Sequence, residues 1–296
     1  SSRMIGVELN FRGLRLSYND MYRQDHSSLG RSIGVFLFNN SANFWGENIK
    51  RLTLSFDKKY GQIGTTTNLS YLRYRMNNNS SLAPGYGNNP LVYQYSASDD
   101  LFAEQLLTYS PSKKLELLAG ASFQFSGNLP KTNDLLSPFD TDEYEAFSHE
   151  RLMEPHPDLG YFGYNPLRYS NTAAFLQAYY NSPKFTFMGG LRHDYNSLYG
   201  NSTNPRFAAL YTINNITSIR FSMGTAFRTP TTSLAYQSVA YFNDDPLIDL
   251  PGYYYAIVPN PDLKPEKFES YEIGVIKKFS KKIRLDLSGY FNQIEN

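Results

Sequence analysis

The stretch from Asn204 to Pro230 alternates apolar and polar residues with the two-residue period of a β-strand, first before and then after a central break. At the break, Asn214 and Asn215 favour a tight turn, because asparagine tolerates positive φ. One face of the two runs carries Phe207, Ala209, Tyr211, Ile213, Ile219, Phe221, Met223 and Thr225. In water this face would need a protein core, whereas in a membrane it can face lipid while the opposite face lines a wet lumen. The stretch therefore predicts a β-hairpin in one of these two environments.

Amino-acid composition is compatible with both a membrane barrel and a soluble β protein. The 296 residues include 25 Tyr, 21 Phe and one Trp, yet the mean hydropathy is −0.47. This combination fits a membrane barrel with aromatic girdles and a polar interior, and it also fits a Tyr-rich soluble sandwich or propeller. A net charge of +1 gives no electrostatic case for nucleic acid, so no nucleic-acid partner is expected. The absence of cysteine removes thiol nucleophiles and Cys-based zinc sites.

The same period recurs along most of the chain and predicts about twelve strands. The predicted strands are Ile5–Phe11, Leu14–Met21, Arg51–Asp57, Gln62–Tyr74, Leu101–Tyr109, Leu115–Phe125, Thr172–Asn181, Phe185–Tyr195, Arg206–Ile213, Ile219–Ala226, Phe268–Lys277 and Ile283–Phe291. Short turns alternate with long connections, and Lys58–Gly61 and Tyr199–Ser202 are interpreted as turns. The long connections expected to be irregular are Arg23–Asn48, Met76–Pro90, Ser126–Tyr169 and Thr229–Pro265.

Strand length and loop length together favour a membrane. The predicted strands have a middle length of about nine residues, close to the ~9–11 that a tilted membrane strand needs and above the ~5–6 usual in soluble sheets. Short turns at one end and long loops at the other are typical of outer-membrane barrels. No apolar run is long enough for a transmembrane helix. The predicted fold class is therefore all-β, an antiparallel transmembrane β-barrel.

A family resemblance sharpens this prediction. Ala226-Phe227-Arg228-Thr229-Pro230, then Asn260 to Glu266, then Tyr271-Glu272-Ile273-Gly274 follow one another in a pattern that resembles the barrel of TonB-dependent outer-membrane receptors. The motifs cover Asn204 to about Asn292, and upstream only the rhythm of strands and loops agrees. The cysteine-free, Asn- and Tyr-rich composition resembles a Bacteroidetes-type receptor.

The resemblance implies a barrel of about 22 strands with a plug in its lumen. Residues 1–296 end just after a strand, without the terminal aromatic residue usual in bacterial outer-membrane proteins. We therefore expect a partial outer-membrane β-barrel domain, with the plug domain and terminal strands absent from this chain. The implied function is uptake of a bulky, scarce nutrient (siderophore, cobalamin or glycan), energised by the TonB complex through that plug. A passive porin or small complete barrel is the alternative, and an outer-membrane phospholipase is a weaker one.

Candidate functional residues fall on the strands and in the long loops. The candidates for a charged lumen wall that contacts a plug or substrate are Arg192, Asp194, Arg220, Arg228 and Glu272. Their alternative role is to pair with neighbouring wall residues and fix the register. The candidates for ligand contact in outer loops are Tyr161, Phe162, Tyr164, Tyr253, Tyr254 and Tyr255. These rings can stack on sugars or siderophore rings, or they can simply pack the loops together.

Catalysis and metal binding find little support. The acidic stretch Asp140–Asp158, with His149 and His156, matches neither a zinc-protease motif nor a calcium loop, so a solvated loop is favoured. Asp244, Asp245 and Asp249 are interpreted as a turn cluster. No nucleophile-elbow motif occurs, although His193 on the lipid-facing parity leaves a Ser/His pair open. We expect no catalytic site, no metal and no cofactor.

Overall fold

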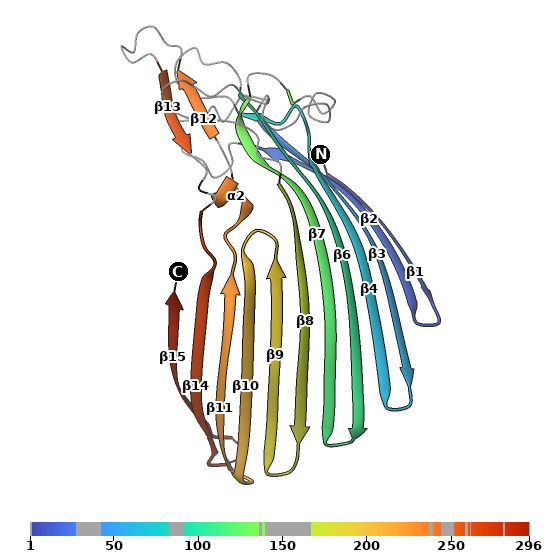
Figure 1. Cartoon of the computed structure of the whole chain (residues 1–296), viewed down its shortest axis with the longest axis vertical. Coiled ribbons are helices and arrows are strands. Elements are labelled where there is room, and N and C mark those ends of the chain that lie inside the picture. Colours follow the sequence, from blue (N-terminus) through green and yellow to red (C-terminus); the bar gives the residue numbers. More distant parts are fainter. Residues whose placement is uncertain are drawn as a thin grey trace.

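The computed structural model describes residues 2–27, 43–82, 92–135, 138–139, 167–236, 239–243, 252–257, 260, 262–280 and 282–295. Its long strands lie side by side in one sheet, and their spatial order is their order along the chain (Figure 1). The sheet has thirteen strands, one of which, the two-residue β5, lies off the main path. Every pairing along that path is antiparallel, as the sequence predicted.

The wall strands are β1 (Arg3–Phe11), β2 (Leu14–His26), β3 (Phe44–Tyr60), β4 (Ile63–Met76), β6 (Val92–Ser112), β7 (Leu115–Leu135), β8 (Leu167–Asn181), β9 (Phe185–Asn196), β10 (Gly200–Asn214), β11 (Thr217–Arg228), β14 (Glu266–Lys278) and β15 (Arg284–Glu295). The other elements are β5 (Ser81–Leu82), the short helix α2 (Thr232–Tyr236) and the hairpin strands β12 (Val239–Asn243) and β13 (Gly252–Ile257). Among the described residues, no helix is long and apolar enough to cross a lipid bilayer.

Tight turns join the strands at one end of the sheet (Figure 1). At Arg12-Gly13 both φ angles are positive, 47° and 90°, as a two-residue hairpin turn requires. A Cβ on Gly13 would lie 2.3 Å from the carbonyl oxygen of Asp57, so this turn needs glycine for space as well as for φ. The predicted alternation of short turns and long connections holds along the sheet except between β9 and β10, which a short turn joins at the opposite end.

The register gives the sheet two unlike faces. On β4 and β6, Ile63 lies opposite Tyr109 and Tyr71 opposite Leu101, and all four side chains are exposed. We call this the outer face and the other the inner face. The apolar band between these two rows is nine residues tall on β4, which matches the ~9–11 residues of a tilted membrane strand. Exposed apolar side chains continue around this face from Phe11 to Phe291, and lipid is the solvent that accommodates them.

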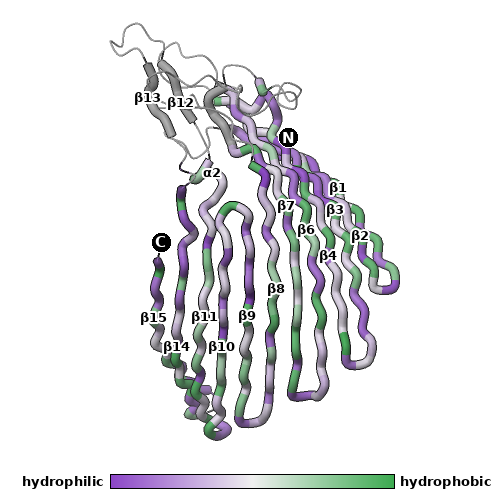
Figure 2. The backbone as a smooth tube through the Cα atoms, viewed as in Figure 1, coloured by the Kyte–Doolittle hydropathy of each residue, from purple (hydrophilic) through white to green (hydrophobic). Residues whose placement is uncertain are grey.

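The strands are longer than predicted, because backbone pairing continues above the apolar band. Strands β6 and β7 each run for 21 residues. The prediction that Ser126–Tyr169 is irregular was therefore wrong over its first part, since β7 continues to Leu135. Hydrophilic residues dominate the upper ends of the strands (Figure 2). Above the band, polar residues and a buried cluster of Met76, Tyr95, Leu129 and Phe139 replace the lipid-facing row, so the apolar alternation that marks a strand in the sequence disappears while the hydrogen-bonded ladder persists.

Other local predictions also need correction. The segments Arg23–Asn48 and Met76–Pro90 are not wholly irregular, because the first contains the ends of β2 and β3 and the second contains β5. Residues 200–202 of the expected turn at Tyr199 belong to β10, which begins at Gly200 with φ of 78°. The segment Thr229–Pro265 is not wholly irregular, because it contains α2 and the β12–β13 hairpin. Tyr253, Tyr254 and Tyr255 therefore lie in strand β13, not in a loop. This hairpin is a separate two-stranded sheet beyond the wall (Figure 1).

Candidate functional site on the inner wall and its outer mouth

The inner face of β11, β14 and β15 carries a network of charges. The Nη2 atom of Arg220 lies 3.0 Å from Glu272 and 3.4 Å from Asp286, and Arg284 contacts Asp286 at 3.1 Å. Arg220, Glu272 and Asp286 all have the inner-face parity of their strands, so the register of the ladder brings them together. Arg220, Glu272 and Asp286 are about one-third exposed, and ion pairs this wet contribute about 0–1 kcal/mol each. The ion pairs therefore fix the orientation of these side chains on the inner face and add little to the free energy of unfolding.

Gly274 makes space for this network. It lies directly opposite Arg220 in the ladder, and a Cβ at Gly274 would meet the Nε of Arg220 at 2.7 Å. The guanidinium stem therefore lies across the bare backbone of β14 and reaches Glu272, two residues away. This contact explains two residues of the Tyr271–Gly274 motif: Glu272 provides the carboxylate that pairs with Arg220, and Gly274 leaves the space that the Arg220 side chain occupies.

A second pair, Arg192 and Asp194, lies on the inner face of β9. Nε of Arg192 donates to both carboxylate oxygens, at 3.1 and 2.9 Å, and Nη2 donates at 2.8 Å. Asp194 is buried, and Arg192 also lies over the ring of Phe175, 5.7 Å from its centroid. The ring of Phe175 in turn occupies the space above Gly120, where a Cβ would meet it at 2.3 Å. The pair is thus locked into the wall.

The motif segments Ala226–Pro230 and Asn260–Glu266 lie next to each other at the outer end of β11 and β14. Arg228 lies opposite Glu266 in the ladder, but their closest charged atoms are 4.0 Å apart and the Arg228 side chain is 77% exposed. Beside them opens a cleft of about 410 Å³. It is lined by Arg228, Thr229, Pro230, Thr231, Leu234, Asp262, Leu263, Lys264 and Glu266. Of the predicted wall residues, Arg228 has the most exposed side chain.

Asn128, Tyr169, Tyr199 and Tyr236 form a polar cluster near the long connections, at the outer end of the sheet. The sequence analysis did not predict this cluster. Asn128 of β7 donates to the hydroxyl of Tyr169 on β8 at 3.3 Å. Tyr199, in the turn between β9 and β10, lies near Tyr169 and Tyr236, and burial, with these neighbours, raises its pKa. Among the described residues, the Asn128 Oδ1 and Tyr199 hydroxyl atoms are buried without a hydrogen-bond partner. Nothing in the local sequence unites four residues that come from four elements.

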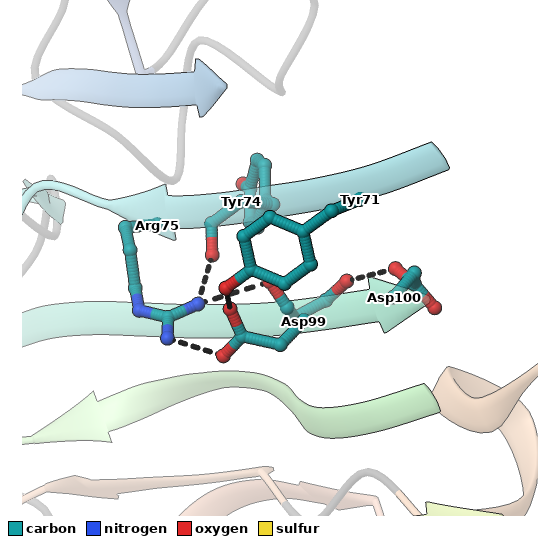
Figure 3. Close-up of polar contacts among 6 residues, drawn as sticks. Tyr71, Tyr74, Arg75, Asp99 and Asp100 are labelled. Atoms are coloured by element: carbon teal, nitrogen blue, oxygen red, sulfur yellow. Dashed lines mark hydrogen bonds and ion pairs between the residues drawn. The ribbon is translucent and has the colours of Figure 1, made fainter. Parts of the chain in front are cut away.

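A third cluster lies on the outer face, above the apolar band (Figure 3). Arg75 binds the carboxylate of Asp99 and donates to the backbone oxygens of Tyr74 and Ser98 at 2.8 and 2.9 Å. The Tyr71 hydroxyl donates to Asp99 at 2.7 Å. Partial burial works to raise the pKa of Asp99, but the hydrogen bonds from Arg75 and Tyr71 outweigh it, so the pKa lies below its usual value.

Most of the other predicted site residues lie outside the part of the chain that the structure describes. Tyr161, Phe162, Tyr164 and the acidic stretch Asp140–Asp158 lie outside the described residues, as do Asp244, Asp245 and Asp249. Within the described ranges, no group of three His, Cys, Asp or Glu residues is placed to hold a metal ion. His193 lies on the outer face, and its Nδ1 is 2.8 Å from the hydroxyl of Thr203, not of a serine.

Comparison with solved structures identifies the architecture. The siderophore receptor PirA from Pseudomonas aeruginosa superposes with a TM-score of 0.64 at 12% identity, over 100% of this chain and 46% of PirA. A mutant of the ferric enterobactin receptor PfeA from the same organism superposes with a TM-score of 0.66 at 11% identity, over 97% of this chain and 41% of PfeA. At these identities the likeness shows the fold alone. The chain spans less than half the length of either receptor.

Sequence comparison agrees. The chain is 29% identical over 125 residues to the vitamin B12 transporter BtuB of Photobacterium profundum, covering 42% of this chain and 18% of that protein. The corresponding figures for BtuB of Vibrio vulnificus are 27% over 133 residues, 45% and 19%. The family described as TonB dependent receptor-like, beta-barrel matches residues 6–296. The chain therefore belongs to the TonB-dependent receptor β-barrel family of the bacterial outer membrane.

Proposed function

We propose that the complete protein imports a bulky, scarce nutrient across the outer membrane, with energy delivered through TonB. The observation that carries this proposal is that the sheet of this TonB-dependent receptor barrel has an apolar outer face and a charged inner face. Its outer face is an apolar band of membrane height, and its inner face holds the Arg220–Glu272–Asp286 network. A polar inner face suits a wet lumen filled by a plug that moves, and this plug lies outside residues 1–296.

The ligand class we propose is a siderophore, cobalamin or a glycan. The names of the similar proteins support the first two: siderophore receptors among the structures and vitamin B12 transporters among the sequences. The segments Ser126–Tyr169 and Thr229–Pro265 would capture the ligand at the outer mouth, with Tyr161, Phe162, Tyr164 and Tyr253–Tyr255 as contacts. The buried, unpartnered Asn128 Oδ1 and Tyr199 hydroxyl support a polar contact at this mouth.

The wall residues divide into two proposed roles. Arg192, Asp194, Arg220 and Glu272 are held by neighbours on the wall, which supports a role in shaping the lumen. Arg228 is exposed beside the cleft, which supports direct contact with a plug or a passing ligand. Substitution of Arg228 should therefore impair uptake without changing the stability of the barrel.

Uptake kinetics test the proposal against its alternatives. An energised receptor predicts saturable uptake that stops when the proton gradient is collapsed. A passive porin predicts uptake that is linear in concentration and indifferent to the gradient. An outer-membrane phospholipase predicts release of fatty acid from phospholipid vesicles; within the described residues, the Thr203 partner of His193 offers this reading no support.

The first measurement is the intact mass of the natural protein from an outer-membrane fraction. A mass well above the 33.8 kDa of this chain would support a plug and further strands. A mass near 33.8 kDa would mean a small complete barrel, and TonB coupling would then be abandoned for a porin or an enzyme.

A further inference from the structure

The inner face carries uncharged polar side chains at the outer ends of β7, β8 and β9. In the ladder Gln124 lies opposite Asn171 and Asn171 opposite Asn196, so three amides form one row across the three strands. Further out lie three residues of the polar cluster described above. We call this surface the amide patch, and its residues are Gln124, Asn128, Tyr169, Asn171, Asn196 and Tyr199. At ~3.3 Å per residue and ~4.8 Å between strands, it extends about 13 Å along β7 and about 10 Å across the strands.

Part of the hydrogen-bonding capacity of the amide patch is unused by the protein. The Asn128 Oδ1 and Tyr199 hydroxyl atoms are buried without a partner, and among the described residues the Asn171 side chain has none either. Asn196, in contrast, is fully engaged in holding the turn that carries Tyr199, because its Oδ1 accepts from the backbone amides of Leu198 and Tyr199 at 2.9 and 3.2 Å. Burying a polar atom without a partner is costly, so the patch favours an occupant that forms hydrogen bonds.

The charges around the amide patch do not suit an anion. On β9, Arg192 is held by three hydrogen bonds to Asp194, which is buried. The carboxylate beside the patch, Asp100 of β6, accepts hydrogen bonds from the hydroxyls of Ser98 and Ser126. In the sequence, residues 136–166 between β7 and β8 include seven acidic residues and one basic residue. An anion placed on the patch would lose its hydration and gain no counter-charge there.

We propose that the amide patch selects an uncharged ligand whose surface carries both hydrogen-bond donors and acceptors, and that it rejects anionic ferric complexes. Amide and phenol groups both donate and accept, so they match the hydroxyls of a neutral glycan or the carboxamides of a cobalamin. The rings of Tyr169 and Tyr199 add apolar area beside these polar groups. The proposal rests on the import function proposed above and selects among its three ligand classes.

Binding to the complete natural protein in detergent tests the proposal. Cyanocobalamin, maltoheptaose and ferric enterobactin are titrated separately by isothermal titration calorimetry. The first two are uncharged and present carboxamides or hydroxyls, whereas the third is anionic. One of the uncharged probes should bind at least about tenfold more tightly than ferric enterobactin, and the probe that binds distinguishes the corrinoid from the glycan. Tighter binding of ferric enterobactin, or no binding of either uncharged probe, would overturn the proposal.

Three variants locate the binding. Tyr199→Phe removes a hydroxyl that has no partner in the described protein, so it should weaken binding of the uncharged probe about tenfold and leave thermal unfolding unchanged. Tyr179→Phe is the matched control, because Tyr179 lies on the same inner face near the turn end of β8. Arg206→Gln removes an exposed inner-face cation of β10 and should also leave binding unchanged. Unchanged binding in Tyr199→Phe, or an equal loss in either of the other variants, would contradict the proposal.

Failure of this proposal and failure of the import function give different results. Saturable uptake of ferric enterobactin that stops when the proton gradient is collapsed would overturn the ligand class and leave energised import standing. Uptake that is linear in concentration and indifferent to the gradient would remove the import function itself, whatever the titrations show.

Discussion

Single residues decide how the charged inner wall is built, and Gly274 is the clearest case. Arg220 reaches Glu272 only because no side chain stands between them on β14. The paired charges are partly exposed, so their value lies in fixing where the guanidinium points and less in the free energy of the pair. The same reasoning applies to Gly120, which accommodates the ring of Phe175 beneath Arg192.

Replacing Gly274 by valine should therefore displace Arg220 and lower the free energy of unfolding by about 1–3 kcal/mol, the usual cost of overpacking. Denaturant unfolding of the complete protein in detergent or vesicles measures this change. Gly289→Val is the matched control, because a Cβ at this glycine of the neighbouring strand β15 would meet no atom within 4 Å. Equal stability of the Gly274 variant and the control would show that Arg220 yields without cost.

Asp99 should make the stability of the outer strand ends depend on pH. Its pKa is lowered in the folded state, so its contribution is complete above the unfolded value of about 3.9 and is lost as pH falls through the folded value. Asp99→Asn should be less stable than the wild type at neutral pH, and the difference should shrink below about pH 4. Thermal unfolding across this range measures it. Arg75→Gln should show the same convergence, and a pH-independent difference in both variants would contradict the assignment.

At the scale of the strand, adjacent residues point to opposite faces of the sheet, so one side chain meets lipid and the next meets the lumen. Leu176 of β8 is 61% exposed on the outer face, within the apolar band, whereas Gln177 points to the inner face. The strand satisfies its backbone through β7 and β9 in either case, so only the side chain experiences the difference.

Leu176→Arg should therefore destabilise the barrel in a bilayer by about 2–4 kcal/mol, and Gln177→Arg by much less. Unfolding in phospholipid vesicles compares the two variants, which differ by one position and carry the same new charge. If the two substitutions cost the same, the assignment of inner and outer faces is wrong.

At the scale of the whole molecule, the open edges of the sheet are the dominant feature. Among the described strands, β1 pairs only with β2 and β15 only with β14. Unpaired backbone groups are costly in lipid, so a membrane wall of this kind is stable only when its edges are covered. Residues 1–296 by themselves would leave both edges exposed.

Hydrogen exchange makes this testable. In the complete protein the amides of β1 and β15 should exchange as slowly as those of β9 and β10, because further strands cover the edges. In the 296-residue chain expressed alone, the amides of β1 and β15 should exchange much faster. Fast exchange of the β1 and β15 amides in the complete protein would contradict edge pairing.

The sequence alone determined the strands of the apolar band, their antiparallel order and their two faces, because lipid on one side and water on the other impose a period of two. Arg206–Ile213 and Ile219–Ala226 were recognisable for this reason. The turn between them lies at Asn215-Ile216, one residue later than expected, and among the described residues no asparagine has positive φ. Asn214 instead accepts hydrogen bonds from the backbone amides of Ile216 and Thr217 through its side-chain oxygen, at 3.0 and 2.9 Å. Above the band lipid no longer imposes that period, because Met76, Tyr95, Leu129 and Phe139 pack into a buried cluster there, and only the structure showed that β7 continues to Leu135. Register across strands likewise decided which charges meet, because Arg220 and Glu272 are separated by a long connection and become neighbours only when β11 pairs with β14.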